Sequence, residues 1–178
     1  MARQIGLSVA RLEDPTLLRG KAKFLDDINL PGQLHVAFLR SPHAHALIER
    51  IDISAAQALA GVHAVITMQD LERSLGNVRM PLSASPTKAS AAITPYLLAG
   101  AEVAFAGEAM VMVAAESRHI AEDAIDLIEV DYTPLPVIMS ARDAVAEDAP
   151  KVRTEAKTNV LNRMGVNYGD VDAAFAKA

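Results

Sequence analysis

The stretch AMVMVAAESRHIAEDAIDLIEVDY, residues 109–132, carries three hydrophobic patterns in succession. Residues 109–115 are apolar throughout, which is typical of a strand buried on both faces. Ser117 is a favourable N-cap, and apolar residues then recur at helical spacing as far as Leu127 and Ile128. From Ile128 to Tyr132 the period changes from 3.6 to 2, so a strand follows. This strand–helix–strand unit predicts a mixture of α and β structure.

Two further strands are predicted near the N-terminal end, at residues 33–40 and 46–53. In the first, Leu34, Val36 and Phe38 face one side and the residues between them face the other. Only a short link containing Ser41-Pro42 separates the two strands, so we expect them to pair as antiparallel neighbours.

A short helix and another strand follow. Asp52 or Ser54 can cap a helix over residues 55–60, and Gly61 can end it in a left-handed conformation. Residues 62–67 then have the pattern of a strand. Residues 74–101, rich in Ser, Pro and Ala, are expected to form a long loop, which is typical of functional or partner-covered segments.

The C-terminal part is less regular. We expect a loose helix at 141–146, a strand at 159–167 and a helix capped by Asp170 that has barely begun when the sequence ends. Such a short helix needs a packing partner, so this end and the loop at 74–101 are the expected docking surfaces. The predicted division is an irregular arm at 1–32, a folded domain at 33–150, and a linker with the start of a following domain at 151–178.

Composition excludes several classes of protein. The formal net charge is −5, with +2 in residues 1–89 and −7 in residues 90–178, so no basic face for nucleic acid is expected. There is no cysteine, which removes disulfides, thiolate catalysis and Cys-based metal sites. No stretch approaches the roughly 20 apolar residues that span a bilayer, and no signal peptide is evident. The expected setting is the cytoplasm.

His43 and His45 invite a metal-site interpretation because side chains two apart on a strand point to the same side. Zinc needs three or four convergent ligands. Only His35 and His63 lie near in the sequence, and no acidic third ligand is obvious. We therefore favour a turn whose imidazoles form hydrogen bonds locally or to a partner.

Three other patterns have simple structural interpretations. A helical stripe of Glu122, Asp126 and Glu129 is expected to be a solvated surface or to face a subunit. The basic stretch 20–24 lacks a phosphate-loop spacing and is expected to be a turn. Met110 and Met112 are expected to fill the core. No GxSxG elbow or Ser/His/Asp set is present, so no catalytic, cofactor-binding or metal-binding residue is assigned.

The linear signatures taken together resemble the N-terminus of molybdenum-hydroxylase large subunits, the family of xanthine dehydrogenase, aldehyde oxidase and carbon monoxide dehydrogenase. The sequence is most similar to the bacterial carbon monoxide dehydrogenase type of molybdopterin-binding large subunit. Nearly the whole chain is covered. The segments that carry the resemblance are 5–9, 11–15, 17–18, 24–27, 30–32, 34–35, 37–38, 40–46, 51–52, 61–62, 64–65, 96–99, 107–108, 115–118, 121–124, 129–136 and 169–175. It departs at Ala109, where the family usually has proline, and at Ala22, where it often has glycine.

The resemblance implies an α+β fold of the α/β hammerhead type, with a mixed, largely antiparallel sheet and a few packed helices. It implies a non-catalytic domain or small subunit, inactive alone, that supplies framework and subunit contacts. The parent enzyme would hydroxylate a small molecule with water as the oxygen source, using molybdopterin cytosine dinucleotide with molybdenum. Iron–sulfur and flavin subunits would carry the electrons, and a homo-oligomer is compatible with this role. No position matches a catalytic motif of the family.

Two other hypotheses remain open at this point. One is a stand-alone interaction or regulatory module without a redox role, and the other is a small enzyme that uses His43 and His45. Metal analysis of the purified chain distinguishes the enzyme hypothesis from the other hypotheses, because a stoichiometric divalent ion is expected only for an enzyme of that kind.

Overall fold

The computed structural model describes residue 6 and residues 8–80, 93–163 and 168–177. The chain forms two compact units, Met1–Gln33 and Leu34–Ala178. In the first unit, α1 (Asp14–Leu18) and the 3-10 turn η1 (Leu25–Asp27) bury none of their side chains. Pro15 lies in the first turn of α1, where the missing N–H costs nothing.

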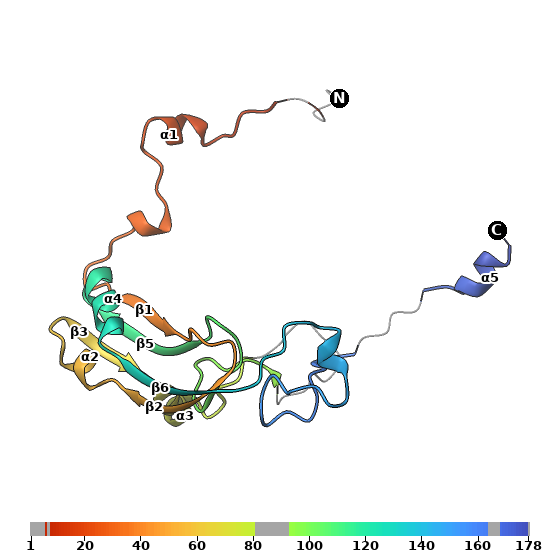
Figure 1. The fold of residues 1–178 in the computed structure, drawn as a ribbon. Helices are drawn as coiled ribbons and strands as arrows, with labels where there is room; N and C mark the ends of the chain where they lie inside the picture. The colour runs from red at the N-terminus through yellow and green to blue at the C-terminus, as the bar shows by residue number, and fades with distance from the viewer. Residues whose placement is uncertain (1–5, 7, 81–92, 164–167, 178) are drawn as a thin grey trace. The chain divides into compact units, whose positions relative to one another are not determined.

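The second unit contains two three-stranded sheets, with strand orders β1-β5-β3 and β4-β2-β6 (Figure 1). All strand pairs are antiparallel. The α+β class with largely antiparallel sheets is therefore confirmed. The elements of this unit are β1 (His35–Arg40), β2 (Ala46–Asp52), α2 (Ser54–Ala58), β3 (Val62–Ile66), α3 (Met68–Leu75), β4 (Glu102–Val103), β5 (Ala109–Ala115), α4 (Arg118–Asp126), β6 (Glu129–Pro134), the 3-10 turn η3 (Asp143–Val145) and α5 (Val171–Phe175).

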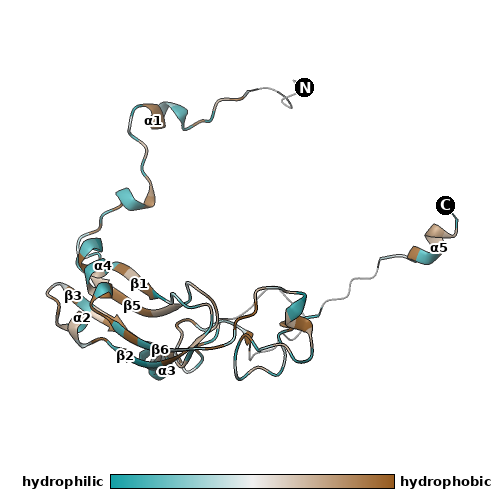
Figure 2. Cartoon of the chain, in the orientation of Figure 1, coloured by the Kyte–Doolittle hydropathy of each residue, from teal (hydrophilic) through white to brown (hydrophobic). Residues whose placement is uncertain are grey.

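Strand β5 is the centre of its sheet, as its apolar sequence predicts. It pairs with β1 on one side and β3 on the other, and Figure 2 shows it in hydrophobic colours. Val111, Val113 and Ala115 are fully buried. Met110 is also fully buried and fills the core, which confirms its predicted role.

The expected hairpin between residues 33–40 and 46–53 is wrong. Both segments are strands, but β1 pairs with β5 while β2 pairs with β4 and β6. The backbone of Ser41 explains the difference, because its N–H donates to Glu108 O (2.9 Å) and its O accepts from Gly107 (2.8 Å). The chain thus stays bonded to the β5 side until Pro42, which has no N–H to donate, and then crosses to the other sheet.

Helix α4 packs on the inner face of the β1-β5-β3 sheet. Ser117 caps it as predicted, its Oγ accepting the N–H of Ile120 at 3.3 Å. Ala121 and Ala124 are fully buried against the core. Leu127 was expected on the same face, but it is 41% exposed because the helix ends at Asp126 and Leu127 is already the C-cap.

Three smaller expectations need correction. Helix α3 was not predicted; a reciprocal pair of hydrogen bonds between Thr67 and Asp70 starts it. The loose helix at 141–146 is a single 3-10 turn. Residues 159–163 form no strand, since the Asn159 side chain bonds instead to three backbone groups of residues 144–152, and residues 164–167 lie outside the described part.

The remaining short elements agree with the sequence. Asp52 accepts the N–H of Ser54 at 3.0 Å at the start of α2, although Ile53 is the N-cap. Gly61 has φ +86° after this helix. Asp170 caps α5 by accepting the N–H of Ala173. Within the described ranges no helix is both long and apolar enough to cross a membrane.

Candidate functional site: a buried polar cluster

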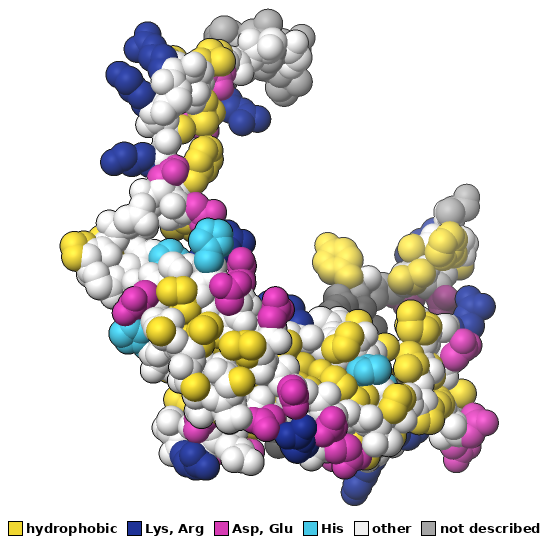
Figure 3. Space-filling view, turned by 60° about the vertical axis from the view of Figure 1, so that its left-hand side comes forward, with side chains coloured by type: hydrophobic (Ala, Val, Ile, Leu, Met, Phe, Trp, Pro, Cys, Tyr) yellow, Lys and Arg dark blue, Asp and Glu magenta, His cyan; other side chains and the backbone are white. Residues whose placement is uncertain are grey.

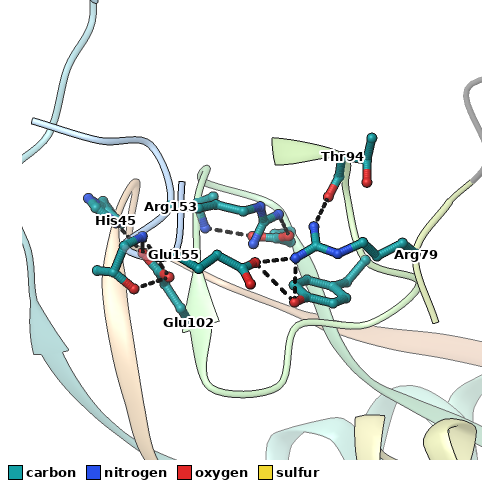
Figure 4. Close-up of polar contacts among 10 residues, drawn as sticks. His45, Arg79, Thr94, Glu102, Arg153 and Glu155 are labelled. Carbon is teal, nitrogen blue, oxygen red and sulfur yellow. Dashed lines mark hydrogen bonds and ion pairs between the residues drawn. The ribbon is translucent and has the colours of Figure 1, made fainter. Parts of the chain in front are cut away.

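A cluster of charged and polar side chains lies where residues 153–155 pass over the ends of β2 and β4 (Figure 4). Its members come from five separate parts of the chain. We call it the polar cluster; its members are His45, Arg79, Tyr96, Glu102, Glu108, Arg153, Thr154 and Glu155.

The centre of the polar cluster is an ion pair between Arg153 and Glu108. Arg153 Nη2 lies 2.6 Å from Glu108 Oε1, and each side chain is only 3% exposed. The other carboxylate oxygen of Glu108 accepts the N–H of Ala104 at 2.6 Å. A buried charge is costly unless it is paired and hydrogen-bonded, and both conditions hold here.

His45 and Glu102 form a second buried contact. His45 Nδ1 lies 2.7 Å from the carbonyl oxygen of Pro136, which only accepts, so Nδ1 must donate. His45 Nε2 lies within hydrogen-bond distance of Glu102 Oε1, at 2.6 Å. Glu102 also accepts the backbone N–H of Thr154 at 3.0 Å and its hydroxyl at 2.9 Å. One imidazole and one carboxylate thus tie three segments together.

Arg79, Tyr96 and Glu155 form the third part. The Arg79 guanidinium donates to Thr94 O (2.8 Å), to the Tyr96 hydroxyl (2.6 Å) and to Glu155. It also lies 4.1 Å from the centre of the Tyr96 ring, and Arg153 lies 5.2 Å from it. Burial and the hydrogen bond to Glu155 raise the pKa of Tyr96. Burial opposes ionisation of Glu155, but hydrogen bonds from Arg79 and Tyr96 and the two guanidinium charges lower its pKa on balance.

The contacts of the polar cluster suit a structural role rather than a catalytic one. Among the described residues, every buried side-chain nitrogen or oxygen has a hydrogen-bond partner. The same residues contain no group of three His, Cys, Asp or Glu side chains placed to hold a metal ion. In the described part of the chain no buried polar side-chain atom is left for a cofactor to complete, so the polar cluster does not fit a molybdenum–pterin group.

The structure separates the two histidines that the sequence places side by side. His43 stacks against Tyr132, with ring centroids 4.7 Å apart, whereas His45 is buried on Glu102. The His45 imidazole is hydrogen-bonded, but not locally, because Pro136 and Glu102 lie 91 and 57 residues away in the sequence. The statement that no acidic partner is obvious is corrected by Glu102, which lies 57 residues away in the sequence.

The structure also shows where the other patterns predicted from the sequence lie. Lys21 N–H donates to Thr16 O at 3.0 Å and Gly20 has φ +63°, so the stretch 20–24 begins in a turn. Glu122 is an exposed partner of Arg118 at 2.9 Å. Glu129 does not share its helical stripe, because it lies in β6 and contacts Arg50 at 3.4 Å.

Sequence reasoning missed most of the polar cluster. Glu108 and Arg153 are 45 residues apart, and nothing in their local spacing relates them. The one available signal was Glu108 itself, a charged residue directly before an entirely apolar strand. Such a residue must find a partner when the strand folds.

An open hollow of about 600 Å³ lies between β2 and α3. Its lining combines apolar residues such as Ile48, Val65 and Ala99 with charged ones such as Glu49 and Arg50. Arg50 is already bonded to Asp131 at 2.9 Å and Asp52 at 3.0 Å. On the face that Figure 3 shows, several basic side chains gather on the first unit, whereas on the second unit single basic side chains lie among acidic ones.

Comparison with known proteins identifies the fold. Residues 19–136 match the family model described as aldehyde oxidase and xanthine dehydrogenase, a/b hammerhead domain. The chain is 42% identical to the nicotine 6-hydroxylase large subunit of Paenarthrobacter nicotinovorans, over 98% of this chain and 21% of that protein. It is 40% identical to the carbon monoxide dehydrogenase large chain of Afipia carboxidovorans, over 98% of this chain and 22% of that protein.

Solved structures agree. A Cu,Mo-CO dehydrogenase structure superposes with a TM-score of 0.75 at 39% identity, covering 97% of this chain and 22% of that one. Quinoline 2-oxidoreductase from Pseudomonas putida 86 gives a TM-score of 0.75 at 37% identity, covering 92% of this chain and 20% of that one. The chain spans about a fifth of the length of these relatives. It belongs to the aldehyde oxidase and xanthine dehydrogenase family of molybdenum hydroxylases, and residues 19–136 are its α/β hammerhead domain.

Proposed function

We propose that this chain is the framework part of a molybdenum-hydroxylase large subunit and supplies no reacting group of its own. The observation that carries the proposal is that 98% of the chain matches only about a fifth of two such large chains. The remaining four fifths of those proteins have no counterpart in this sequence. In this account the parent enzyme hydroxylates or oxidises a small molecule, and the chain alone is inactive.

The polar cluster supports a framework role. It binds residues 153–155 to β4 and to the start of β5 through buried, charge-assisted hydrogen bonds. Each of its buried side-chain nitrogens and oxygens has a hydrogen-bond partner, either within the polar cluster or in the neighbouring backbone. A site of that kind gives rigidity to the domain and leaves no acid, base or nucleophile free for substrate.

The proposal also includes partners and setting. The names of several relatives describe parts of larger enzymes, among them the large molybdopterin subunit of nicotinate dehydrogenase from Eubacterium barkeri. By analogy, the neighbours of this chain are a part that binds molybdopterin cytosine dinucleotide and separate iron–sulfur and flavin subunits. A cytoplasmic setting and a division into residues 1–32, 33–150 and 151–178 complete the proposal.

A chimera tests this function. The chain replaces the matching fifth of the Afipia carboxidovorans carbon monoxide dehydrogenase large chain, which is 40% identical to it. We expect the chimera to co-purify with the other subunits of that enzyme and to bind molybdenum as the parent does. The purified chain alone is the control, and it is expected to contain no stoichiometric metal. A folded chimera that stays apart from those subunits, or a divalent ion bound to the chain alone, contradicts the proposal.

A further inference from the structure

The outward face of the β1-β5-β3 sheet is apolar apart from Arg40 at its edge, whose guanidinium lies 5.6 Å from the centre of the Phe38 ring. The solvent-facing side of an antiparallel sheet is normally polar. The register places Val36, Ala114 and Ala64 in one row across the three strands, and Phe38, Met112 and Ile66 in the next. We call these six residues the outer apolar face. None of them carries a charge or a hydrogen-bonding side chain.

The outer apolar face is accessible. Val36 is 49% exposed and Phe38 is 41% exposed, and the other four residues are partly buried. Their neighbours along the strands, Ala37 and Val113, point to the inner face and pack in the core. The face is therefore a second hydrophobic surface of the sheet, directly behind the first.

The other sheet shows what an ordinary solvent-facing surface looks like in this chain. On β2 and β6, Arg50 lies opposite Asp131 and Asp52 lies opposite Glu129. Arg50 bonds to acidic side chains of both strands, at 2.9 Å to Asp131 and 3.4 Å to Glu129 on β6 and at 3.0 Å to Asp52 on β2. The contrast between the two sheets shows that the apolar character belongs to the β1-β5-β3 sheet and is not a general property of the surface.

The size of the outer apolar face favours one kind of occupant. Three strands about 4.8 Å apart and two rows about 7 Å apart give an area on the order of 200 Å². A stable interface between two proteins needs about 800 Å² from each partner. Two copies of this chain meeting at the face alone would fall well short, whereas a contact within a longer polypeptide can extend over neighbouring surfaces.

We propose that the outer apolar face is the surface on which the rest of the large subunit, including its molybdopterin-binding part, packs through apolar side chains. This inference rests on the proposed function. The length of the relatives supports this occupant, because about four fifths of their polypeptide lies outside the matched region. The face then becomes a continuation of the subunit core.

The absence of cysteine from the sequence allows a direct test with single-cysteine labelling. Val36→Cys lies on the outer apolar face, and Leu75→Cys lies on α3 at a residue that is similarly exposed, 56% against 49%. Both variants are made in the chain and in the chimera, and alkylation by iodoacetamide is followed by mass spectrometry. We expect Val36→Cys to react about tenfold or more slowly in the chimera than in the chain, with Leu75→Cys unchanged.

Each of the other possible outcomes contradicts the inference, and the labelling rates show which part of it is wrong. Equal rates for Val36→Cys in the chain and in an assembled chimera contradict the docking surface alone. A slow rate already in the isolated chain means that its own residues or a second copy cover the face, and its dependence on protein concentration separates these two. A chimera that folds but does not assemble contradicts the proposed function and the docking surface with it.

A charge substitution gives an independent readout. Val36→Glu places a carboxylate on the outer apolar face and leaves the core untouched, so the isolated chain keeps its unfolding midpoint. In the chimera it reduces recovery of the assembled enzyme by about tenfold or more, because an unpaired charge would be buried. Leu75→Glu, the matched control, assembles normally. Normal assembly of the Val36→Glu chimera contradicts the inference.

Discussion

At the scale of single residues, the buried charges of the polar cluster decide how residues 153–155 are held. Glu108 and Arg153 are each 3% exposed and have each other as charged partner. Arg118 and Glu122 form a pair of the same chemistry on the surface of α4, with 70% and 52% exposure. The contribution of an ion pair to the free energy of unfolding therefore depends mainly on how deeply the pair is buried.

Arg153→Met tests this difference. It leaves the Glu108 carboxylate buried without its partner and should lower the free energy of unfolding by about 3–5 kcal/mol. The control Arg118→Met should change it by less than about 1 kcal/mol. Urea unfolding measures both. Adding Glu108→Gln to Arg153→Met should restore part of the loss, and a double variant less stable than Arg153→Met alone would contradict the explanation.

Asp70, at the start of α3, is expected to make the stability of the fold depend on pH. The hydrogen bonds that its carboxylate accepts from Thr67 lower its pKa below the ordinary value of 3.8. The ionised form is therefore favoured by folding, and its contribution is present above about pH 4 and is lost as the pH falls through the lower pKa of the folded state. Between pH 5 and pH 2.5 the unfolding midpoint should fall less in Asp70→Asn than in the unsubstituted chain. Equal falls in the two proteins would exclude this role.

At the scale of elements, the packing of α2 against α4 depends on one glycine. Gly61 has φ +86°, and a Cβ added to it would lie 2.8 Å from Ile120 Cδ1. Gly107 has a similar φ of +90° but no atom within 4 Å of an added Cβ. Comparing the same substitution at the two positions therefore distinguishes the cost of backbone strain from the cost of side-chain crowding.

Gly107→Ala should cost about 1–2 kcal/mol of stability from the left-handed backbone alone. Gly61→Ala should cost more, because Ile120 must also move. In an Ile120→Val background, which lacks Cδ1, the cost of Gly61→Ala should fall towards that of Gly107→Ala. Thermal unfolding of the four variants gives the coupling, and purely additive effects would show that the crowding is absent.

Elements with a local signal were predictable from the sequence, and pairings between distant elements were not. The apolar run of β5 and the Ser117 cap of α4 gave those two elements correctly. The hairpin between β1 and β2 was wrong because nothing local to Ser41 shows that its backbone bonds to residues 107 and 108. The polar cluster was missed for the same reason, since Glu102 meets His45 across 57 residues.

At the scale of the whole molecule, every buried side-chain nitrogen or oxygen among the described residues has a hydrogen-bond partner, whereas the outer apolar face is left accessible by the rest of the second unit. The first property supports a framework role and the second supports packing against further polypeptide. The resemblance seen in the sequence identified the family correctly, although the sheet pairings that create the outer apolar face could not be read from it.

The most direct test of the framework role is the rate of carbon monoxide oxidation per bound molybdenum in the chimera. If the chain contributes no reacting group, exchanging one hammerhead domain for another should leave this rate within about tenfold of the parent, a barrier change of about 1.4 kcal/mol. A chimera that assembles and binds molybdenum normally, yet oxidises carbon monoxide about a thousandfold more slowly, would contradict the account.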